Sequence, residues 1–127
     1  IDARSYRTDP VDRVTRTLLD TIADNAADAG VVLSDVRFRP DDVDLRWVGA
    51  ILKRNGVVEE TGVAAGVLDD PVLGIVWLAR RLAGHGVHLA AGSVVLCGSF
   101  TRPVPCRAGD EFEADYRELG TIRASFR

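Results

Sequence analysis

The chain has 127 residues, close to the usual size of one domain, and we expect a single domain over residues 1–127. Hydrophobic residues make up 46% of it and charged residues 28%, a composition that excludes a disordered tail. The net charge is −3, and the 16 basic residues are scattered among 19 acidic ones, which argues against nucleic acid or an anionic membrane surface as partner.

Targeting signals and cysteines give further expectations about context. No apolar run approaches the roughly 18 residues of a membrane helix, and no signal peptide opens the chain, so we expect a cytoplasmic protein. The chain begins at Ile1 and contains no methionine, which suggests a part of something longer. Cys97 and Cys106 are nine apart, a spacing of neither a zinc site nor a CxxC motif, and we interpret them as buried or half-buried thiols.

The first third of the chain predicts short elements. In order, we expect a short strand and a polar loop at Asp9-Pro10 within residues 1–19, a helix over 20–30, a strand over 31–38 and a turn over 39–42. Asp20 is a suitable N-cap for that helix and Gly30 a suitable residue to end it.

A β-hairpin is the clearest local prediction. The residues of 45–52 alternate and are mostly apolar, which indicates a strand buried on both faces near its middle. Asn55-Gly56 is the strongest short hairpin signal, because both turn positions favour positive φ. We expect the return strand over 57–65.

One helix and three further strands follow. Residues 69–86 predict a helix capped by Asp70, with Pro71 in its first turn and an apolar stripe at 3–4 spacing. A buried strand is expected over 93–98, and an alternating strand over 109–116 returns over 121–126 after a turn. The chain therefore predicts a mostly-β α+β fold, or β roll, with few helices.

Several polar clusters have plain structural explanations. Glu111, Glu113 and Asp115 share one strand face and could bind a hard cation, but a solvated face is the more common meaning. His85 and His88 lack a third ligand nearby, which favours a surface loop. The acidic run Asp41, Asp42 and Asp44 is typical of a turn.

Two segments are better site candidates. Asp24 and Asn25 interrupt an apolar helical pattern, so they are either useful or satisfied by local capping bonds. "GSFT" at 98–101 ends an apolar run with backbone N–H groups and two hydroxyls, which suits a small anion such as a carboxylate, although a plain turn remains open.

Longer strings resemble a known family. "RNGVVEETGVAAGVL", "WLARRLAGHGV" and "GSFTRPVPCRAGDEFEADYRELGTIRASFR" are similar to the C-terminal half of the 2-keto-4-pentenoate hydratase family, whose fold is the mixed β roll of the fumarylacetoacetase C-terminal domain. The likeness runs essentially from Ile1 to Arg127. It is strongest to the branch that hydrates seven-carbon dienoic 2-oxo diacids.

The resemblance implies an activity and a cofactor. It implies a lyase of aromatic catabolism that adds water to 2-oxohept-3-ene-1,7-dioate to give 4-hydroxy-2-oxoheptanedioate, with Mg²⁺ (or Mn²⁺) as Lewis acid. A 2-oxopent-4-enoate hydratase and a 2-oxo acid decarboxylase are alternatives, and a truncated, non-catalytic β domain is another. The family's metal-binding glutamates lie ahead of the matched segment, so we assign no metal ligand and expect the chain alone to be inactive.

Three loop residues and two helix residues carry over from the family. The resemblance implies that Ser99, Phe100 and Thr101 hold the 2-oxo acid end of the substrate. It places Asp24 and Asn25 beside the metal site, as catalytic candidates that orient ligands or water. Arg102 is our candidate for the far carboxylate of a diacid, against the alternative of a surface arginine. A homo-oligomer is expected because the family is oligomeric.

Overall fold

The computed structural model describes Ile1 and residues 17–127. The strand and loop predicted before residue 17 lie outside this range. The chain divides into two compact units, residues 1–33 and 34–127, and each is described by itself. In the part of the chain that is described, no helix is long and apolar enough to cross a membrane.

The N-terminal unit contains the short helix α1, Leu18–Ala23. Thr17, rather than the predicted Asp20, is its N-cap: Asp20 N–H donates to Thr17 Oγ1 at 3.2 Å, and Thr17 N–H donates to Asp20 Oδ2 at 2.8 Å. This reciprocal pair is a capping box, which satisfies two otherwise unpaired donors of the first turn.

The helix predicted over 20–30 ends early. Residues 25–27 form a 3₁₀ turn in which Asn25, Ala26 and Ala27 have φ values of 47°, 57° and 59°. Three successive residues in the left-handed region cannot continue a right-handed helix. Gly30 follows, and its carbonyl accepts a hydrogen bond from the Ile1 ammonium at 2.9 Å.

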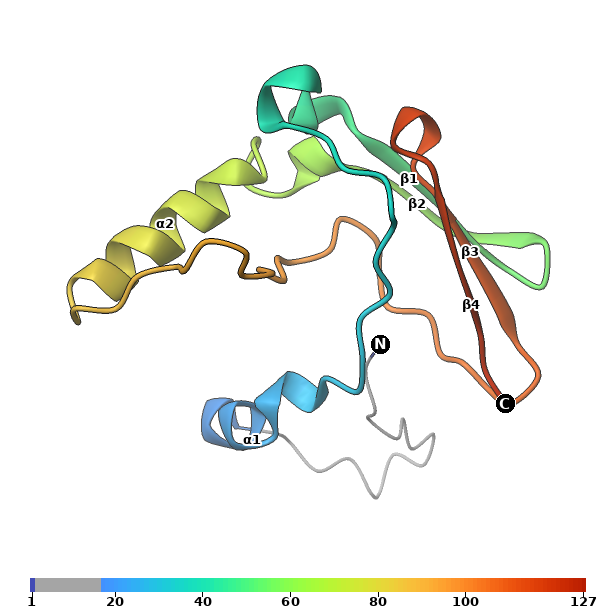
Figure 1. Ribbon diagram of the computed structural model, residues 1–127. Helices are drawn as coiled ribbons and strands as arrows, with labels where there is room; N and C mark the ends of the chain where they lie inside the picture. Colours follow the sequence, from blue (N-terminus) through green and yellow to red (C-terminus); the bar gives the residue numbers. More distant parts are fainter. Residues whose placement is uncertain (2–16) are drawn as a thin grey trace. The chain divides into compact units, whose positions relative to one another are not determined.

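The C-terminal unit is built on a four-stranded antiparallel sheet of order β2-β1-β3-β4 (Figure 1). Its strands are β1 (Gly49–Arg54), β2 (Val57–Val63), β3 (Glu111–Asp115) and β4 (Thr121–Ser125). The predicted turn is confirmed, with Asn55 at φ 52° and Gly56 at φ 80°. A 3₁₀ turn over Leu45–Trp47 precedes β1, so the strand begins later than the alternation indicated.

The register sorts the side chains of the sheet onto two faces. Directly opposed residues share a face, so Ala50, Leu52, Phe112, Ala114, Ile122 and Ala124 form an apolar face. Lys53, Glu113 and Arg123 lie opposite one another on the polar face. The predicted alternation of β3 is therefore confirmed. A bulge between Leu52 and Lys53 leaves Glu59 as an extra residue in β2.

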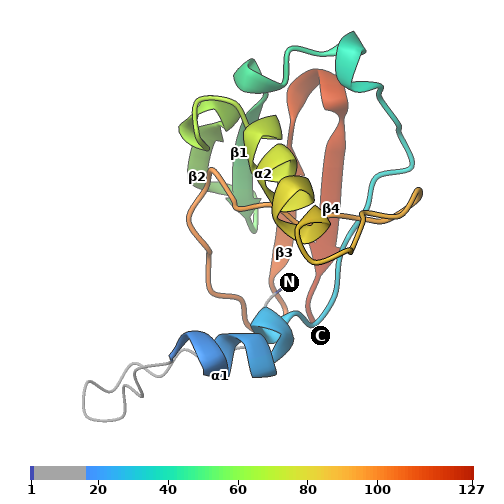
Figure 2. The same ribbon diagram turned by 90° about the vertical axis from the view of Figure 1, so that its left-hand side faces the viewer.

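The helix predicted over 69–86 is confirmed as α2, Val72–Ala83. The Asp70 carboxylate accepts a hydrogen bond from Val72 N–H at 2.9 Å, as expected of a capping residue. In Figures 1 and 2, α2 projects beyond the sheet instead of lying flat on it. Its apolar stripe consequently stays accessible, with Ile75 and Val76 each 36% exposed.

Two predicted strands are wrong. Residues 31–38 and 93–98 are described but form no strand, and Val94 and Leu96 are 61% and 60% exposed. An apolar run becomes a buried strand only when another segment pairs with it and covers it, and the described residues supply neither for these two runs. Cys97, in the second of these runs, and Cys106 are exposed, so their prediction as buried or half-buried thiols is also wrong.

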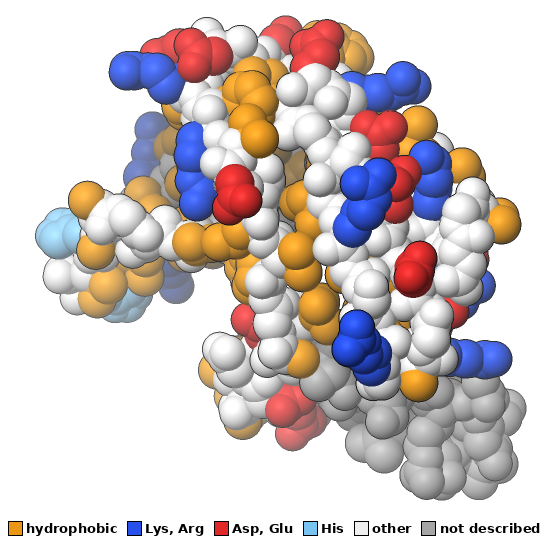
Figure 3. Space-filling model, turned by 45° about the vertical axis from the view of Figure 1, so that its right-hand side comes forward, with side chains coloured by type: hydrophobic (Ala, Val, Ile, Leu, Met, Phe, Trp, Pro, Cys, Tyr) orange, Lys and Arg blue, Asp and Glu red, His pale blue; other side chains and the backbone are white. Residues whose placement is uncertain are grey.

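The core of the described residues is small. The buried apolar side chains are those of Ala27, Ala50 and Ala64, and no large side chain is fully buried. Figure 3 shows hydrophobic side chains exposed among Lys, Arg, Asp and Glu side chains. The architecture is α+β, as the sequence predicts, with one antiparallel sheet and few helices.

Candidate functional site at residues 98–105

Two hydroxyls face each other in the loop that follows residue 98. Ser99 Oγ lies 3.0 Å from Thr101 Oγ1 and accepts a hydrogen bond from Thr101 N–H at 3.1 Å. When the Thr101 hydroxyl donates to Ser99, the Ser99 proton is left to donate outward. Ser99 is exposed and Thr101 half-buried, so the Ser99 hydroxyl is accessible to a ligand oxygen.

Arg102 already has a carboxylate partner within the chain. Its Nε and Nη2 lie 3.0 Å and 2.8 Å from Oε1 of Glu60, on β2. The Arg102 side chain is 84% exposed, whereas that of Glu60 is only 18% exposed. The guanidinium thus stays open to solvent while one of its edges is held by the sheet.

Phe100 packs against the backbone of the same strand. A Cβ built on Gly62 would lie 2.2 Å from the Phe100 carbonyl oxygen and 2.9 Å from its ring Cδ2. Real Cβ atoms do not approach other atoms this closely, so the loop requires glycine at this position. Further along, Arg54 Nη1 donates to the Pro105 carbonyl at 3.2 Å.

The other candidate pair lies in the N-terminal unit. Asp24 is the C-terminal cap of α1, where its N–H donates to the Asp20 carbonyl at 3.0 Å, and Asn25 opens the left-handed turn. Both are exposed and neither lies inside an apolar helix, contrary to the expected setting. The Ser99 loop belongs to the other unit, so each pair is described only with its own neighbours.

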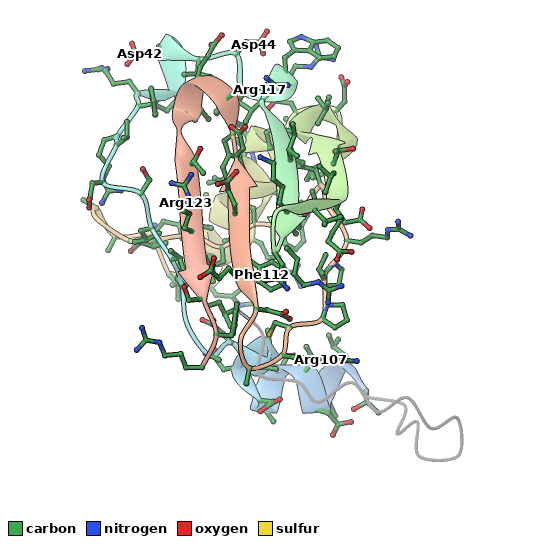
Figure 4. All side chains as sticks on the ribbon, turned by 90° about the vertical axis from the view of Figure 1, so that its right-hand side faces the viewer. Asp42, Asp44, Arg107, Phe112, Arg117 and Arg123 are labelled. Carbon is green, nitrogen blue, oxygen red and sulfur yellow. The ribbon has the colours of Figure 1, made fainter. Side chains whose placement is uncertain are left out.

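A row of charges crosses the polar face of the sheet (Figure 4 labels Arg123 on β4). Glu113 accepts from Lys53 Nζ at 2.8 Å and from Arg123 Nη2 at 2.7 Å. The hydrogen bond from Lys53, followed by those from Arg123, holds the pKa of Glu113 below its ordinary value. Beside this row is a hollow of about 490 Å³, lined mainly by β3 and β4. The Glu113 carboxylate is already neutralised by Lys53 and Arg123, so this row of charges is a cross-strand ion-pair ladder.

Metal ligands do not gather in the described part of the chain. No group of three or more His, Cys, Asp or Glu residues is placed to hold an ion there. His85 and His88 are exposed after α2, and Glu111, Glu113 and Asp115 lie along one strand face without converging. The donor groups of the described residues do not fit a divalent cation.

The sequence analysis missed two residues that support the loop. Glu60 and Gly62 belong to "EETG" in β2, a string noted only for family resemblance. An acidic residue and a glycine two apart on an edge strand were a possible signal for a segment crossing that strand. Local sequence patterns could not identify Arg102 as the partner of Glu60, because the two residues are 42 positions apart.

No family model matches the chain. Comparison with known proteins finds 54% identity to "2-oxo-hept-4-ene-1,7-dioate hydratase" of Escherichia coli, over 99% of this chain and 47% of that protein. A "4-oxalocrotonate decarboxylase" of Pseudomonas putida is 35% identical over 86% of this chain and 41% of the relative. The chain thus spans less than half the length of these curated relatives.

Solved structures give the same result. "4-Oxalocrotonate decarboxylase from Pseudomonas putida G7", complexed with calcium and acetate, matches with a TM-score of 0.74 and 34% identity, over 86% of this chain and 42% of that one. The same protein complexed with magnesium and adipate matches with a TM-score of 0.74 and 34% identity, over 86% of this chain and 41% of that one. The chain is therefore similar in sequence and in fold to part of these hydratases and decarboxylases. Its predicted resemblance to the 2-keto-4-pentenoate hydratases and to a 2-oxoheptenedioate hydratase is confirmed.

Proposed function

We propose that the chain forms the substrate-holding part of a hydro-lyase that adds water to 2-oxoheptenedioate, giving 4-hydroxy-2-oxoheptanedioate. The observation that carries the proposal is the 54% identity to the E. coli hydratase along 99% of the chain. The other relatives include both hydratases and decarboxylases of 2-oxo acids, which supports the substrate class more broadly. Their printed names fit the breakdown of aromatic compounds.

Binding of the 2-oxo acid head is the role we give to residues 99–101. The Ser99 hydroxyl accepts from Thr101 N–H, and when the Thr101 hydroxyl also donates to it, its own proton is free to donate to a carboxylate or oxo oxygen. Phe100 supplies the apolar contact that fixes the loop between the two hydroxyls. Arg102 remains our candidate for the far carboxylate, with Glu60 orienting its guanidinium.

The relatives suggest divalent metal chemistry, because the solved decarboxylase is complexed with calcium or with magnesium. The described residues do not fit such an ion. We propose that the ligands belong to the portion that the relatives have beyond the matched segment. Asp24 and Asn25 stay candidates for orienting ligands or water next to that portion.

The exposed apolar side chains bear on folding and assembly. Large hydrophobic residues are exposed in α2, β2 and both irregular apolar runs, at Val57, Trp77, Val94 and Leu96 among others. Surfaces of this kind are usually covered by more protein. We therefore propose that residues 1–127 are one part of a single catalytic domain, which assembles as a homo-oligomer.

A chimera tests the proposal directly. We would replace the 126 matched residues of the E. coli hydratase with this chain and follow loss of dienoate absorbance with Mg²⁺, alongside release of CO₂. Water addition without CO₂ release is expected. CO₂ release instead would make it a decarboxylase, and an inactive but folded chimera would favour a non-catalytic domain. The isolated 127-residue chain should show negligible activity.

A serine substitution then tests the site. In the chimera, Ser99→Ala should weaken 2-oxo acid binding by about 1–3 kcal/mol, the cost of a lost donor to a bound oxygen. The effect should fall on KM more than on kcat. Ser93→Ala, an exposed serine in the same connection, is the matched control and should leave both unchanged. Equal kinetics for the two variants would remove Ser99 from the site.

A further inference from the structure

We propose that Glu60 and Gly62 of β2 are positioning residues that hold the substrate-binding loop in place. This inference rests on the proposed function of the loop and adds two residues that touch no substrate themselves. It also assigns a structural role to the Arg102 guanidinium edge that faces Glu60.

The two residues act from the same face of the sheet. Ala50 pairs with Gly62 and Leu52 pairs with Glu60 in the β1–β2 register, so both β2 positions point to the apolar face. Arg54, two residues beyond Leu52 in β1, points to this face too. The loop therefore crosses the apolar face over β2 and β1.

Three anchors fix the course of the loop. Phe100 rests on Gly62, Arg102 pairs with Glu60, and the Pro105 carbonyl accepts from Arg54. Residue numbers increase along the loop while those of its contacts in β2 decrease, from Gly62 to Glu60, so this segment runs antiparallel to β2. Arg54 Nη2 is in turn held by Glu59 Oε1 at 2.6 Å, which fixes the last anchor.

The anchors determine where the hydroxyls point. The backbone bends at Phe100 and Thr101, while Phe100 and the Arg102 guanidinium contact β2. Within this bend, Ser99 Oγ lies 3.0 Å from Thr101 Oγ1 and accepts from Thr101 N–H at 3.1 Å, so the two hydroxyls are held together between the Phe100 and Arg102 anchors. Moving either anchor would therefore move the donor that we assign to the 2-oxo acid.

Gly62→Ala is the sharpest test in the chimera. The added Cβ would meet a backbone oxygen at 2.2 Å and ordinary contact begins at 3.4 Å, so the Phe100 carbonyl must move by roughly an ångström. Displacement on that scale costs on the order of 100-fold in rate, and we expect that loss in kcat/KM. Gly49→Ala, on the neighbouring strand, is the matched control because its added Cβ would meet its nearest atom at 3.7 Å. Its kcat/KM should stay close to that of the parent chimera. Equal effects of the two variants would overturn the proposal.

A charge swap separates positioning from substrate binding. With a 2-oxo acid that lacks a second carboxylate as substrate, Glu60→Arg and Arg102→Glu should each lower kcat/KM about tenfold, and the double variant should recover most of it. Asp69→Asn, which removes the carboxylate partner of Arg46 elsewhere, controls for loss of an exposed pair. If both single variants spare the 2-oxo acid without a second carboxylate, or the double variant does not recover its turnover, Glu60 is not a positioning residue.

The isolated chain gives a readout that does not depend on activity. Amide hydrogen exchange of residues 99–105 should speed up in Gly62→Ala and Glu60→Gln, while the hairpin of residues 49–63 keeps its protection. Faster exchange in the variants, together with an inactive parent chimera, would support Glu60 and Gly62 as positioning residues and reject the proposed function. Unchanged exchange in both variants would reject Glu60 and Gly62 as positioning residues, whether or not the chimera is active.

Discussion

Asn55 joins the hairpin turn to the segment that leads into β3, and its replacement is the most informative stability test. Its side-chain amide donates to Asp110 Oδ1 at 2.8 Å, and its Oδ1 accepts from Glu111 N–H at 2.9 Å. Its backbone N–H donates to the Glu111 carbonyl at 2.8 Å. With φ at 52°, Asn55 also occupies the left-handed region that most side chains avoid.

Two substitutions separate these contributions. Asn55→Gly keeps the backbone conformation and loses the side-chain bonds, of which the one to Glu111 is worth about 0.5–1.5 kcal/mol. Asn55→Ala adds the cost of a left-handed alanine, about 1–2 kcal/mol, for a total of about 1.5–3.5 kcal/mol. The expected order of stability is parent, then Asn55→Gly, then Asn55→Ala.

The assay combines urea unfolding with a titration. The hydrogen bond from Asn55, then that from Arg107 N–H, holds the pKa of Asp110 below its ordinary value of 3.8. Either substitution should raise that pKa toward the ordinary value, measured by NMR. Identical urea midpoints for all three proteins, or an unmoved Asp110 titration, would refute the role assigned to the side chain.

Two other predictions concern acid stability and thiol access. The pKa of Glu113 is lowered in the folded chain, so its ion pairs stabilise the fold above its ordinary value of 4.5, and this stabilisation is lost as pH falls through the lower folded value. Glu113→Gln should flatten that acid-side loss in a pH series of urea midpoints; an unaltered pH profile would contradict it. Because Cys97 and Cys106 are exposed, both should react with Ellman's reagent without denaturant, and protection of either would mean that it is covered.

Local signals in the sequence were sufficient for much of the C-terminal unit. Asn55-Gly56 predicts the hairpin because the turn residues set their own backbone angles. Asp70 and the apolar stripe predict α2 because helix bonds connect residues close in sequence. The strands at 111–115 and 121–125 follow from alternation and a short turn.

Features that depend on distant partners were not predictable in this way. The apolar runs at 31–38 and 93–98 match a buried strand in composition, yet burial needs a neighbour that periodicity does not reveal. The helix near residue 20 ends at a left-handed turn, although alanines in that turn favour helix. Ser99 was found from the loop's residues and the resemblance, and Arg102 from the charge of a diacid, but the Glu60 contact required the fold.

The bulge at Glu59 sets the phase of β2 relative to the loop. With that one additional residue, Glu60 and Gly62 reach the face where Phe100 and Arg102 lie. Deleting it while the turn stays paired would rotate both to the opposite side, leaving the guanidinium without its carboxylate. An insertion or deletion in β2 should therefore disturb the loop contacts far more than a substitution does. Any homologue with a shorter β2 must anchor its hydroxyl loop by other means.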